Sequence, residues 1–295
     1  MATNPLRVMP YPSRLRSWGW GIVLLIPFIL FFWQRLNILA LTWMSDGIYS
    51  LCPFVPLISL VLIYLNQNHL RDLPVKPSAL GLVWLALSLA VTLWFDSRTI
   101  GFLSFTPLLM VATLAGCILA MWGWQALREM AFPVAFLLFL MPVPPKLMVA
   151  IDYPLQTLCA RTTAGLANLV GLGLQCTGAQ LQFPNPQTSL LVAPACNGLR
   201  STVALLALSA VYAYLLKGPW YRKSLLVVAA VPLAYVGNFV RLMALAGLVS
   251  AGGEKIMTYM PMIEPCLGLL AFLLPLALLY SLARTLQCRE FRHIG

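Results

Sequence analysis

Two arginines and one cysteine stand out because they lie in or against long apolar stretches of the chain. Cys196 and Arg200 belong to the pentapeptide Cys-Asn-Gly-Leu-Arg, and Arg241 ends the tetrapeptide Asn-Phe-Val-Arg. The chain is 61% hydrophobic and only 9% charged. A charged side chain at membrane depth costs about 2.5 kcal/mol or more on insertion scales, so two arginines near one thiol suggest a site. The chemistry that fits is a thiolate nucleophile activated by guanidinium groups.

The local pattern assigns a role to each of these residues. Cys196 follows a proline and is predicted to begin a helix, where unpaired amide groups favour an anion. Arg200 would then lie on the same helix face, about 6 Å further along the axis. We expect Arg241 either to hold the substrate carbonyl oxygen as charge develops or to stabilise the thiolate. Arg200, Asn197 and Asn238 are expected to bind substrate or stabilise the thiolate. A lone buried arginine can be structural and a lone buried cysteine inert, but their joint placement on one side of the membrane favours a site.

The elements that must position these residues are membrane helices. A mean hydropathy of +0.87 excludes an ordinary soluble domain, and a helix needs about 18 or more apolar residues to cross a bilayer. The predicted fold is an all-α polytopic bundle of about eight transmembrane helices, forming a single domain over residues 1–295. The predicted segments are Trp18–Trp33, Gly47–Leu65, Leu80–Phe95, Ile100–Trp122, Ala131–Val143, Cys196–Leu216, Leu225–Val249 and Cys266–Leu286.

The net charge of +11 follows the predicted topology. With a cytoplasmic N-terminus, twelve of the 19 basic residues lie on the inner side, which is the positive-inside pattern. The first apolar segment has no convincing cleavage site and is interpreted as a retained helix. The basic residues therefore indicate topology and contact with anionic lipid, and no nucleic acid is expected as a partner. Both termini are predicted to be cytoplasmic, and the site to face outward from the inner membrane.

The long stretch between the fifth and sixth segments has a different character. Its prolines at 142, 144 and 145 cannot continue a helix. Residues Leu147–Leu172 mix apolar and polar side chains and are interpreted as a helix on the outer membrane interface. Residues Gly178–Pro194 predict a hairpin or an extended loop that leads into Cys196.

The remaining cysteines offer little chemistry. Cys52, Cys117 and Cys288 are interpreted as small buried hydrophobes, and no Cys-x-x-Cys pair supports a zinc or redox site. No metal and no cofactor is expected. A disulfide among Cys159, Cys176 and Cys266 cannot be assigned from the sequence.

With these residues in view, the chain resembles the exosortase/archaeosortase family of membrane cysteine transpeptidases over roughly Phe132 to Pro275. The resemblance is carried by residues 132–144, Pro154-Leu-Gln156, the Leu172-Gly-Leu-Gln turn, Val192-Ala-Pro-Ala-Cys-Asn-Gly-Leu-Arg-Ser201 and Gly237-Asn-Phe-Val-Arg241. It implies a catalytic part at about residues 130–275, with Cys196 as nucleophile and Arg241 as catalytic arginine. It also implies exported substrates that carry a C-terminal sorting signal of the PEP-CTERM type, linked with exopolysaccharide: a short motif, a transmembrane helix and a basic tail.

One position departs from the bacterial pattern, which usually has a histidine just before the last span. The only histidines here are His69 and His293, both cytoplasmic in the predicted topology. Glu264 takes the corresponding place, where a carboxylate could act as a general base, pair with an arginine, or be a plain interfacial charge. The predicted function is an exosortase-like protease and transpeptidase acting through a Cys196 thioester. The alternatives are a membrane transporter, or a non-catalytic scaffold for exopolysaccharide or envelope assembly.

Overall fold

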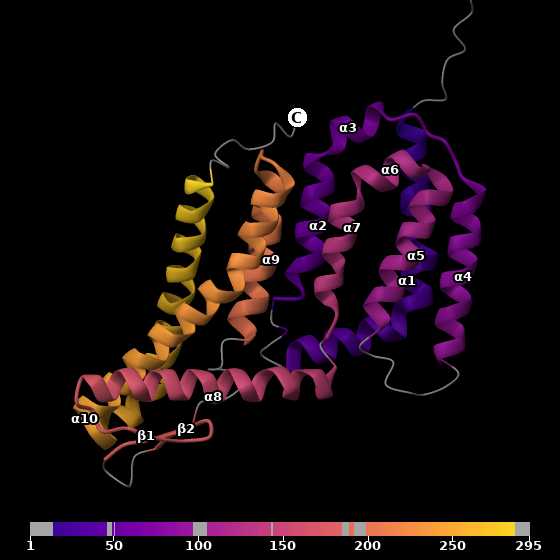
Figure 1. Ribbon diagram of the computed structural model, residues 1–295. Coiled ribbons are helices and arrows are strands. Elements are labelled where there is room, and N and C mark those ends of the chain that lie inside the picture. Colours follow the sequence, from indigo (N-terminus) through magenta and orange to yellow (C-terminus); the bar gives the residue numbers. More distant parts are fainter. Residues whose placement is uncertain are drawn as a thin grey trace, which may run out of the picture. The chain divides into compact units, whose positions relative to one another are not determined.

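The computed structural model describes residues 14–45, 49, 51–96, 105–142, 144–184, 189–191 and 199–286. These residues are almost entirely helical, with one small antiparallel sheet (Figure 1). The elements are α1 (Arg14–Ser45), α2 (Phe54–Leu65), α3 (Gln67–Asp72), α4 (Ala79–Asp96), α5 (Thr106–Met121), α6 (Trp124–Glu129), α7 (Ala131–Phe136), the 3-10 helix η3 (Leu137–Leu140), α8 (Pro145–Leu169), β1 (Gln175–Thr177), β2 (Gln180–Gln182), β3 (Ser189–Leu191), α9 (Leu199–Leu215) and α10 (Trp220–Thr285).

The predicted apolar segments coincide with apolar helices. Three helices are long and apolar enough to cross a membrane: Ile26–Ser45, Trp220–Gly253 and Thr258–Thr285. Five shorter apolar helices, of 10 to 17 residues, match the other five predicted segments, with ends inside them or one residue outside: Phe54–Leu65, Ala79–Phe95, Thr106–Met121, Ala131–Leu140 and Leu199–Leu215. The fold is therefore that of a helical membrane protein, while the count of eight crossings stays a prediction.

The first predicted segment ends too early. It stops at Trp33 because Gln34 and Arg35 are polar, but α1 continues through them to Ser45. The Arg35 guanidinium donates to the carbonyl of Phe31, at 3.3 Å, and lies over the Phe31 ring, 5.3 Å from its centroid. The helix itself accommodates the charge, so the arginine does not end it.

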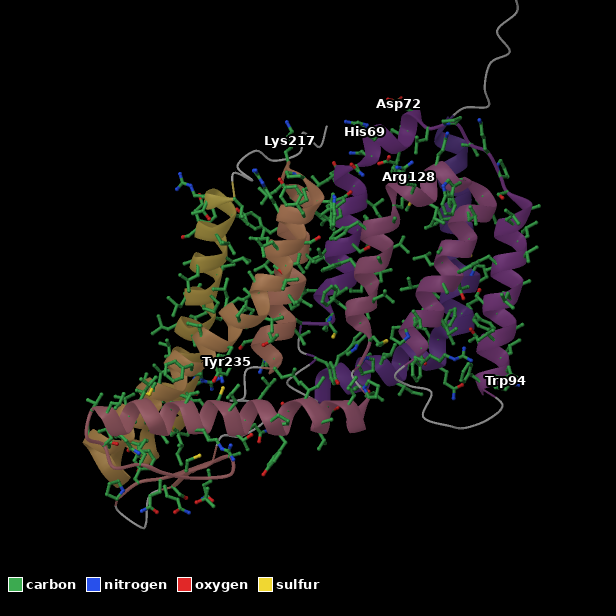
Figure 2. All side chains as sticks on the ribbon, in the orientation of Figure 1. His69, Asp72, Trp94, Arg128, Lys217 and Tyr235 are labelled. Atoms are coloured by element: carbon green, nitrogen blue, oxygen red, sulfur yellow. The ribbon has the colours of Figure 1, made fainter. Side chains whose placement is uncertain are left out.

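The chain divides into two compact units, residues 1–42 with 53–141, and residues 43–52 with 142–294. In the first unit α4 packs closely on α5, since a Cβ at Gly81 would lie 2.2 Å from the backbone nitrogen of Ala120. His69 and Asp72 on α3 and Arg128 on α6 lie at one end of this unit. Trp94, on α4, lies at the opposite end of the unit (Figure 2). The expectation of a single domain stays a prediction.

The second unit contains all the residues predicted for chemistry. In Figure 1, α8 runs crosswise to α9 and α10, and it is not among the long or short apolar helices. The prediction of a helix followed by extended structure between the fifth and sixth segments is confirmed. The extended part is a three-stranded antiparallel sheet in the order β1-β2-β3, and Gly178, with φ of 63°, turns β1 into β2.

The last two predicted segments form one helical element. α10 runs from Trp220 to Thr285 and is broken only at Gly253, whose φ and ψ are 55° and −138°. The predicted segments end at Val249 and resume at Cys266, and these limits are wrong because both legs continue as helix up to this break. A residue with a Cβ would be strained at this φ, whereas glycine adopts it at no steric cost. The first leg is Trp220–Gly253 and the second leg is Thr258–Thr285.

The first leg packs on α8 and the sheet through an apolar cluster. Its largest members from the sheet region are Leu174, Leu181 and Phe183, and α10 contributes Leu242 and Val249. On α8 the buried residues are small: Cys159, Ala160, Ala164 and Ala167. Small side chains let two helix backbones approach closely, so α8 is held tightly against the part of α10 that carries Asn238 and Arg241.

Candidate functional site

An ion pair joins the two legs of α10. Arg241 on the first leg donates from Nη2 to Oε1 of Glu264 on the second leg, at 2.8 Å. The Arg241 side chain is 13% exposed and that of Glu264 is 38% exposed. The charged atoms are thus shielded on one side and reachable from the other. This is the environment in which a guanidinium can bind a developing negative charge.

The break at Gly253 produces this pairing. Arg241 lies twelve residues before the break and Glu264 eleven residues after it, so the two side chains come to the same level when the chain folds back. The legs touch here because Gly237 has no side chain: a Cβ at that position would lie 2.3 Å from the carbonyl oxygen of Ala271. Gly268 also leaves room, since its Cβ would be 3.8 Å from Cζ of Arg241. One of the roles left open for Glu264, pairing with an arginine, is the one the structure contains.

Asn238 has a different environment, although it lies one turn from Arg241. It is 3% exposed, and its Nδ2 donates to Sγ of Cys159 on α8, at 3.6 Å. Its predicted contact with substrate or with the Cys196 thiolate stays a prediction.

A second polar contact lies beside the first. The Tyr235 hydroxyl, also on the first leg, hydrogen-bonds Oγ1 of Thr162 at 3.0 Å, and Figure 2 shows Tyr235 where α10 passes α8. Burial raises the pKa of the Cys159 thiol, and the hydrogen bonds from Asn238 and Tyr235 offset part of that rise. Cys159 is therefore a neutral thiol that accepts hydrogen bonds.

The remaining predicted residues are placed as follows. Arg200 is the second residue of α9 (Leu199–Leu215), and its side chain is exposed. Cys196 and Asn197 lie outside the described residues, so the predicted helix start at Cys196 and its spacing to Arg200 are not tested. The structure therefore brings together Arg241 and Glu264, and separately Asn238 and Cys159.

The cysteines left open for disulfide bonding are free thiols. Cys159 is buried, Cys176 is half-buried and Cys266 is exposed. The Cys176 thiol donates to the carbonyl of Gly178, at 3.4 Å. Within the described ranges, no group of three or more His, Cys, Asp or Glu side chains could hold a metal ion.

Sequence reasoning missed the Cys159 and Tyr235 contacts and a buried carboxyl on α8. Asp152 is 7% exposed, and its Oδ2 accepts from Nε2 of Gln156, at 3.3 Å. Its Oδ1 is buried with no hydrogen-bond partner. Burial raises the pKa of Asp152, and the Gln156 hydrogen bond offsets part of that rise. Asp152 and Cys159 are seven residues apart, a spacing that puts both on one face of a helix. This spacing is the signal in the sequence that could have revealed a buried polar face on α8.

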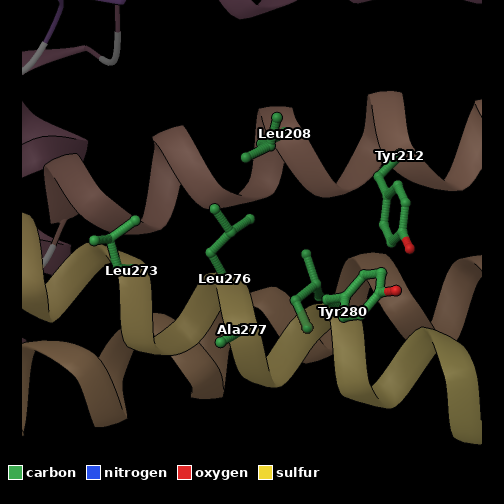
Figure 3. Close-up of a pocket in the computed structure, with 7 residues that line it drawn as sticks. Leu208, Tyr212, Leu273, Leu276, Ala277 and Tyr280 are labelled. Atoms are coloured by element: carbon green, nitrogen blue, oxygen red, sulfur yellow. The ribbon is translucent and has the colours of Figure 1, made fainter.

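An apolar groove lies in the second unit away from these residues. It has a volume of about 630 Å³ and runs between α9 and the second leg of α10 (Figure 3). Its lining is formed by Leu208, Tyr212, Leu273, Leu276, Ala277, Leu279 and Tyr280. None of the residues predicted for chemistry contributes to it.

Comparison with known families places the chain. A family model described as transmembrane exosortase matches residues 43–281. The chain belongs to the transmembrane exosortase family. The exosortase match begins well before Phe132, where the resemblance found in the sequence begins, and it includes Cys196, Arg241 and Glu264. No curated protein and no solved structure matches the chain.

Proposed function

We propose that this exosortase-family protein cleaves C-terminal sorting signals of exported proteins and transfers the acyl group to an acceptor through a thioester on Cys196. The substrate would carry a short motif of the PEP-CTERM type, a transmembrane helix and a basic tail. The observation that carries the proposal is the Arg241–Glu264 pair, with Nη2 and Oε1 at 2.8 Å. It places a shielded guanidinium and a carboxylate together at two positions that the sequence had selected separately.

The Cys196 thiolate attacks the carbonyl carbon at the scissile peptide bond. A C–S bond forms, the C–N bond breaks, and the leaving nitrogen takes up a proton from water, which leaves a thioester. The acceptor, or water, then forms a bond to the thioester carbonyl carbon and releases a proton to solvent, while the C–S bond breaks and its electron pair returns to sulfur. During both steps negative charge develops on the carbonyl oxygen.

Arg241 is the group proposed to stabilise that charge. Its guanidinium is planar and offers several N–H donors in a fixed geometry, and its side chain is only 13% exposed, so water screens it weakly. Glu264 takes one Nη2 hydrogen bond and so limits the rotamers of the arginine. We assign to Glu264 the role of orienting Arg241, at the position where the bacterial pattern of the resemblance usually has a histidine.

The proposal is tested by changing Cys196 in the full-length protein in its native host. With Cys196→Ala, and also with Cys196→Ser, we expect tailed substrates to accumulate at their unprocessed size on immunoblots. The loss should be complete in Cys196→Ala, which has no nucleophile, and nearly complete in Cys196→Ser, whose hydroxyl is a much weaker nucleophile than a thiolate.

Cys266→Ala is the matched control, because Cys266 is an exposed thiol two residues from Glu264. We expect this variant to process substrate normally. Unchanged processing by Cys196→Ala would reject the cysteine peptidase and leave the scaffold or the transporter as the function.

A further inference from the structure

The contact between α8 and the first leg of α10 is mostly apolar, yet it contains two cross-helix hydrogen-bonded pairs. Asn238 donates to Cys159, with Nδ2 and Sγ at 3.6 Å, and Tyr235 pairs with Thr162, with the two hydroxyl oxygens at 3.0 Å. Cys159 is 0% exposed and Asn238 is 3% exposed. Polar groups this deeply buried need their partners, because an unsatisfied one costs about 1–3 kcal/mol.

These contacts lie on one face of the first leg, and Arg241 lies on the adjoining face. The face toward α8 carries Asn238, Leu242, Ala246 and Val249, at spacings of four, four and three residues. Arg241 is three residues after Asn238, so about 4.5 Å further along the helix axis. A helix is stiff over one turn, so whatever fixes Asn238 also fixes the direction in which Arg241 leaves the backbone.

Apolar packing alone does not fix this direction. Burial of alanines and leucines is favourable over a range of small rotations and slides, because the hydrophobic effect is non-directional. Hydrogen bonds weaken steeply when distance or angle changes. Two of them, at residues three apart on the same leg, set both the rotation of the leg and its height against α8.

We propose that Asn238 and Tyr235, through Cys159 and Thr162 on α8, are positioning residues that aim Arg241 at the reacting carbonyl. The inference rests on the proposed function, because it requires Arg241 to act on the substrate. It gives Asn238 a role other than direct contact with the substrate, and it gives the crosswise helix α8 a part in catalysis without a contact to the reacting atoms.

The central experiment is a double-mutant cycle on the full-length enzyme in host-lipid vesicles with a tailed substrate. Asn238→Ala and Cys159→Ala are each made in the wild type and in an Arg241→Lys background. In the wild type we expect kcat to fall about tenfold with KM unchanged, because a small misplacement of a catalytic group lowers the rate and not the affinity. In the Arg241→Lys background we expect no further loss, because the misplaced group is already gone.

Two variants serve as controls. Cys159→Ser keeps a hydrogen-bond acceptor for Asn238, and we expect it to retain most of the turnover that Cys159→Ala loses. Asn168 lies at the C-terminal end of α8, the helix that carries Cys159. Asn168→Ala removes two hydrogen bonds there, from Nδ2 to the Leu174 carbonyl at 2.9 Å and from the Leu174 amide to Oδ1 at 2.6 Å. We expect it to lower the melting temperature and leave kcat of the folded enzyme unchanged.

A second readout does not depend on activity. Phenylglyoxal modifies accessible guanidinium groups, and mass spectrometry reports the rate at each arginine. We expect Asn238→Ala and Cys159→Ala to raise the rate at Arg241 severalfold and to leave the rate at exposed Arg128 unchanged.

Two results overturn the proposal. One is a loss of kcat in Asn238→Ala that multiplies with the loss in Arg241→Lys, which would mean independent action on the substrate. The other is an unchanged rate of modification at Arg241, which would mean that the contacts stabilise the fold and do not position the side chain. Failure of the proposed function is a separate outcome, in which the Cys196→Ala variant still processes substrate. The rate of phenylglyoxal modification at Arg241 would then still decide whether Asn238 and Cys159 position that side chain.

Discussion

Asn238 and Arg241 are three residues apart on the same helix, and their surroundings differ sharply. Asn238 is 3% exposed and meets a neutral thiol on α8. Arg241 is 13% exposed and meets a carboxylate that is itself 38% exposed. The first contact is closed to solvent and uncharged, which suits a structural link. The second is charged and open on one side, which suits a group that must receive a substrate.

The comparison teaches that one turn of helix can serve two purposes when two neighbouring faces meet different partners. One face of the first leg packs against α8, and the next face packs against the second leg, where Gly237 allows the approach. Because both faces belong to one rigid turn, the contact of Asn238 with Cys159 determines the direction in which Arg241 points.

Among the residues of these two contacts, the largest effect should come from Arg241. Arg241→Lys keeps the charge and loses the planar fork of donors. We expect kcat/KM for processing to fall by about 10²–10³, as when one donor to a developing oxyanion is removed. Turnover of a tailed substrate by the reconstituted enzyme measures this. A variant that keeps at least half of the wild-type kcat/KM would show that Arg241 does not stabilise the developing charge.

A smaller effect is expected at Glu264. Glu264→Gln keeps an amide oxygen that accepts from Nη2 of Arg241, so we expect kcat to fall about tenfold or less, below the 10²–10⁴ that loss of a general base produces. Glu264→His is the companion variant, and its rate should acquire a pH dependence near the imidazole pKa, about 6.5. The dependence of kcat on pH in both variants distinguishes a residue that orients Arg241 from a general base. A fall in kcat of more than about tenfold in Glu264→Gln would mean that the carboxylate acts as a base.

The smallest effect concerns stability and sharpens the contrast on α8 itself. There the Cys159 thiol has hydrogen-bond partners, whereas the Asp152 carboxyl has a buried Oδ1 without one. Burial raises the pKa of Asp152, so the folded state favours the protonated form, and the wild type loses stability as the pH rises through that raised pKa. Asp152→Asn does not titrate. We expect it to be more stable than the wild type by about 1 kcal/mol above that pKa.

The measurement is thermal unfolding followed by tryptophan fluorescence across a pH series. The difference between Asp152→Asn and the wild type should shrink as the pH falls. A difference that is constant with pH, or a destabilised Asn variant at neutral pH, would contradict the account of an uncompensated carboxyl.

Much of the fold followed from apolar patterns. Each of the eight predicted segments overlaps an apolar helix of the structure, because runs of Leu, Val and Phe at this density have few other stable arrangements. The two errors at helix ends share one cause. Arg35 within α1, and the polar and proline-containing residues that follow Gly253, interrupt the apolar pattern without ending a helix. The Arg35 guanidinium donates to the Phe31 carbonyl of its own helix, and the second leg of α10 continues beyond the break.

The sequence by itself determined the membrane class and the choice of Arg241, because a charged residue in apolar surroundings is conspicuous in one dimension. The family resemblance, also visible in the sequence, singled out Glu264. The sequence did not determine that these two side chains pair, since their approach depends on a break at Gly253 and close leg packing at Gly237. Nor did it determine that Asn238 meets Cys159, 79 residues away in the chain. Contacts between distant residues depend on how helices cross, and only the tertiary structure decides that.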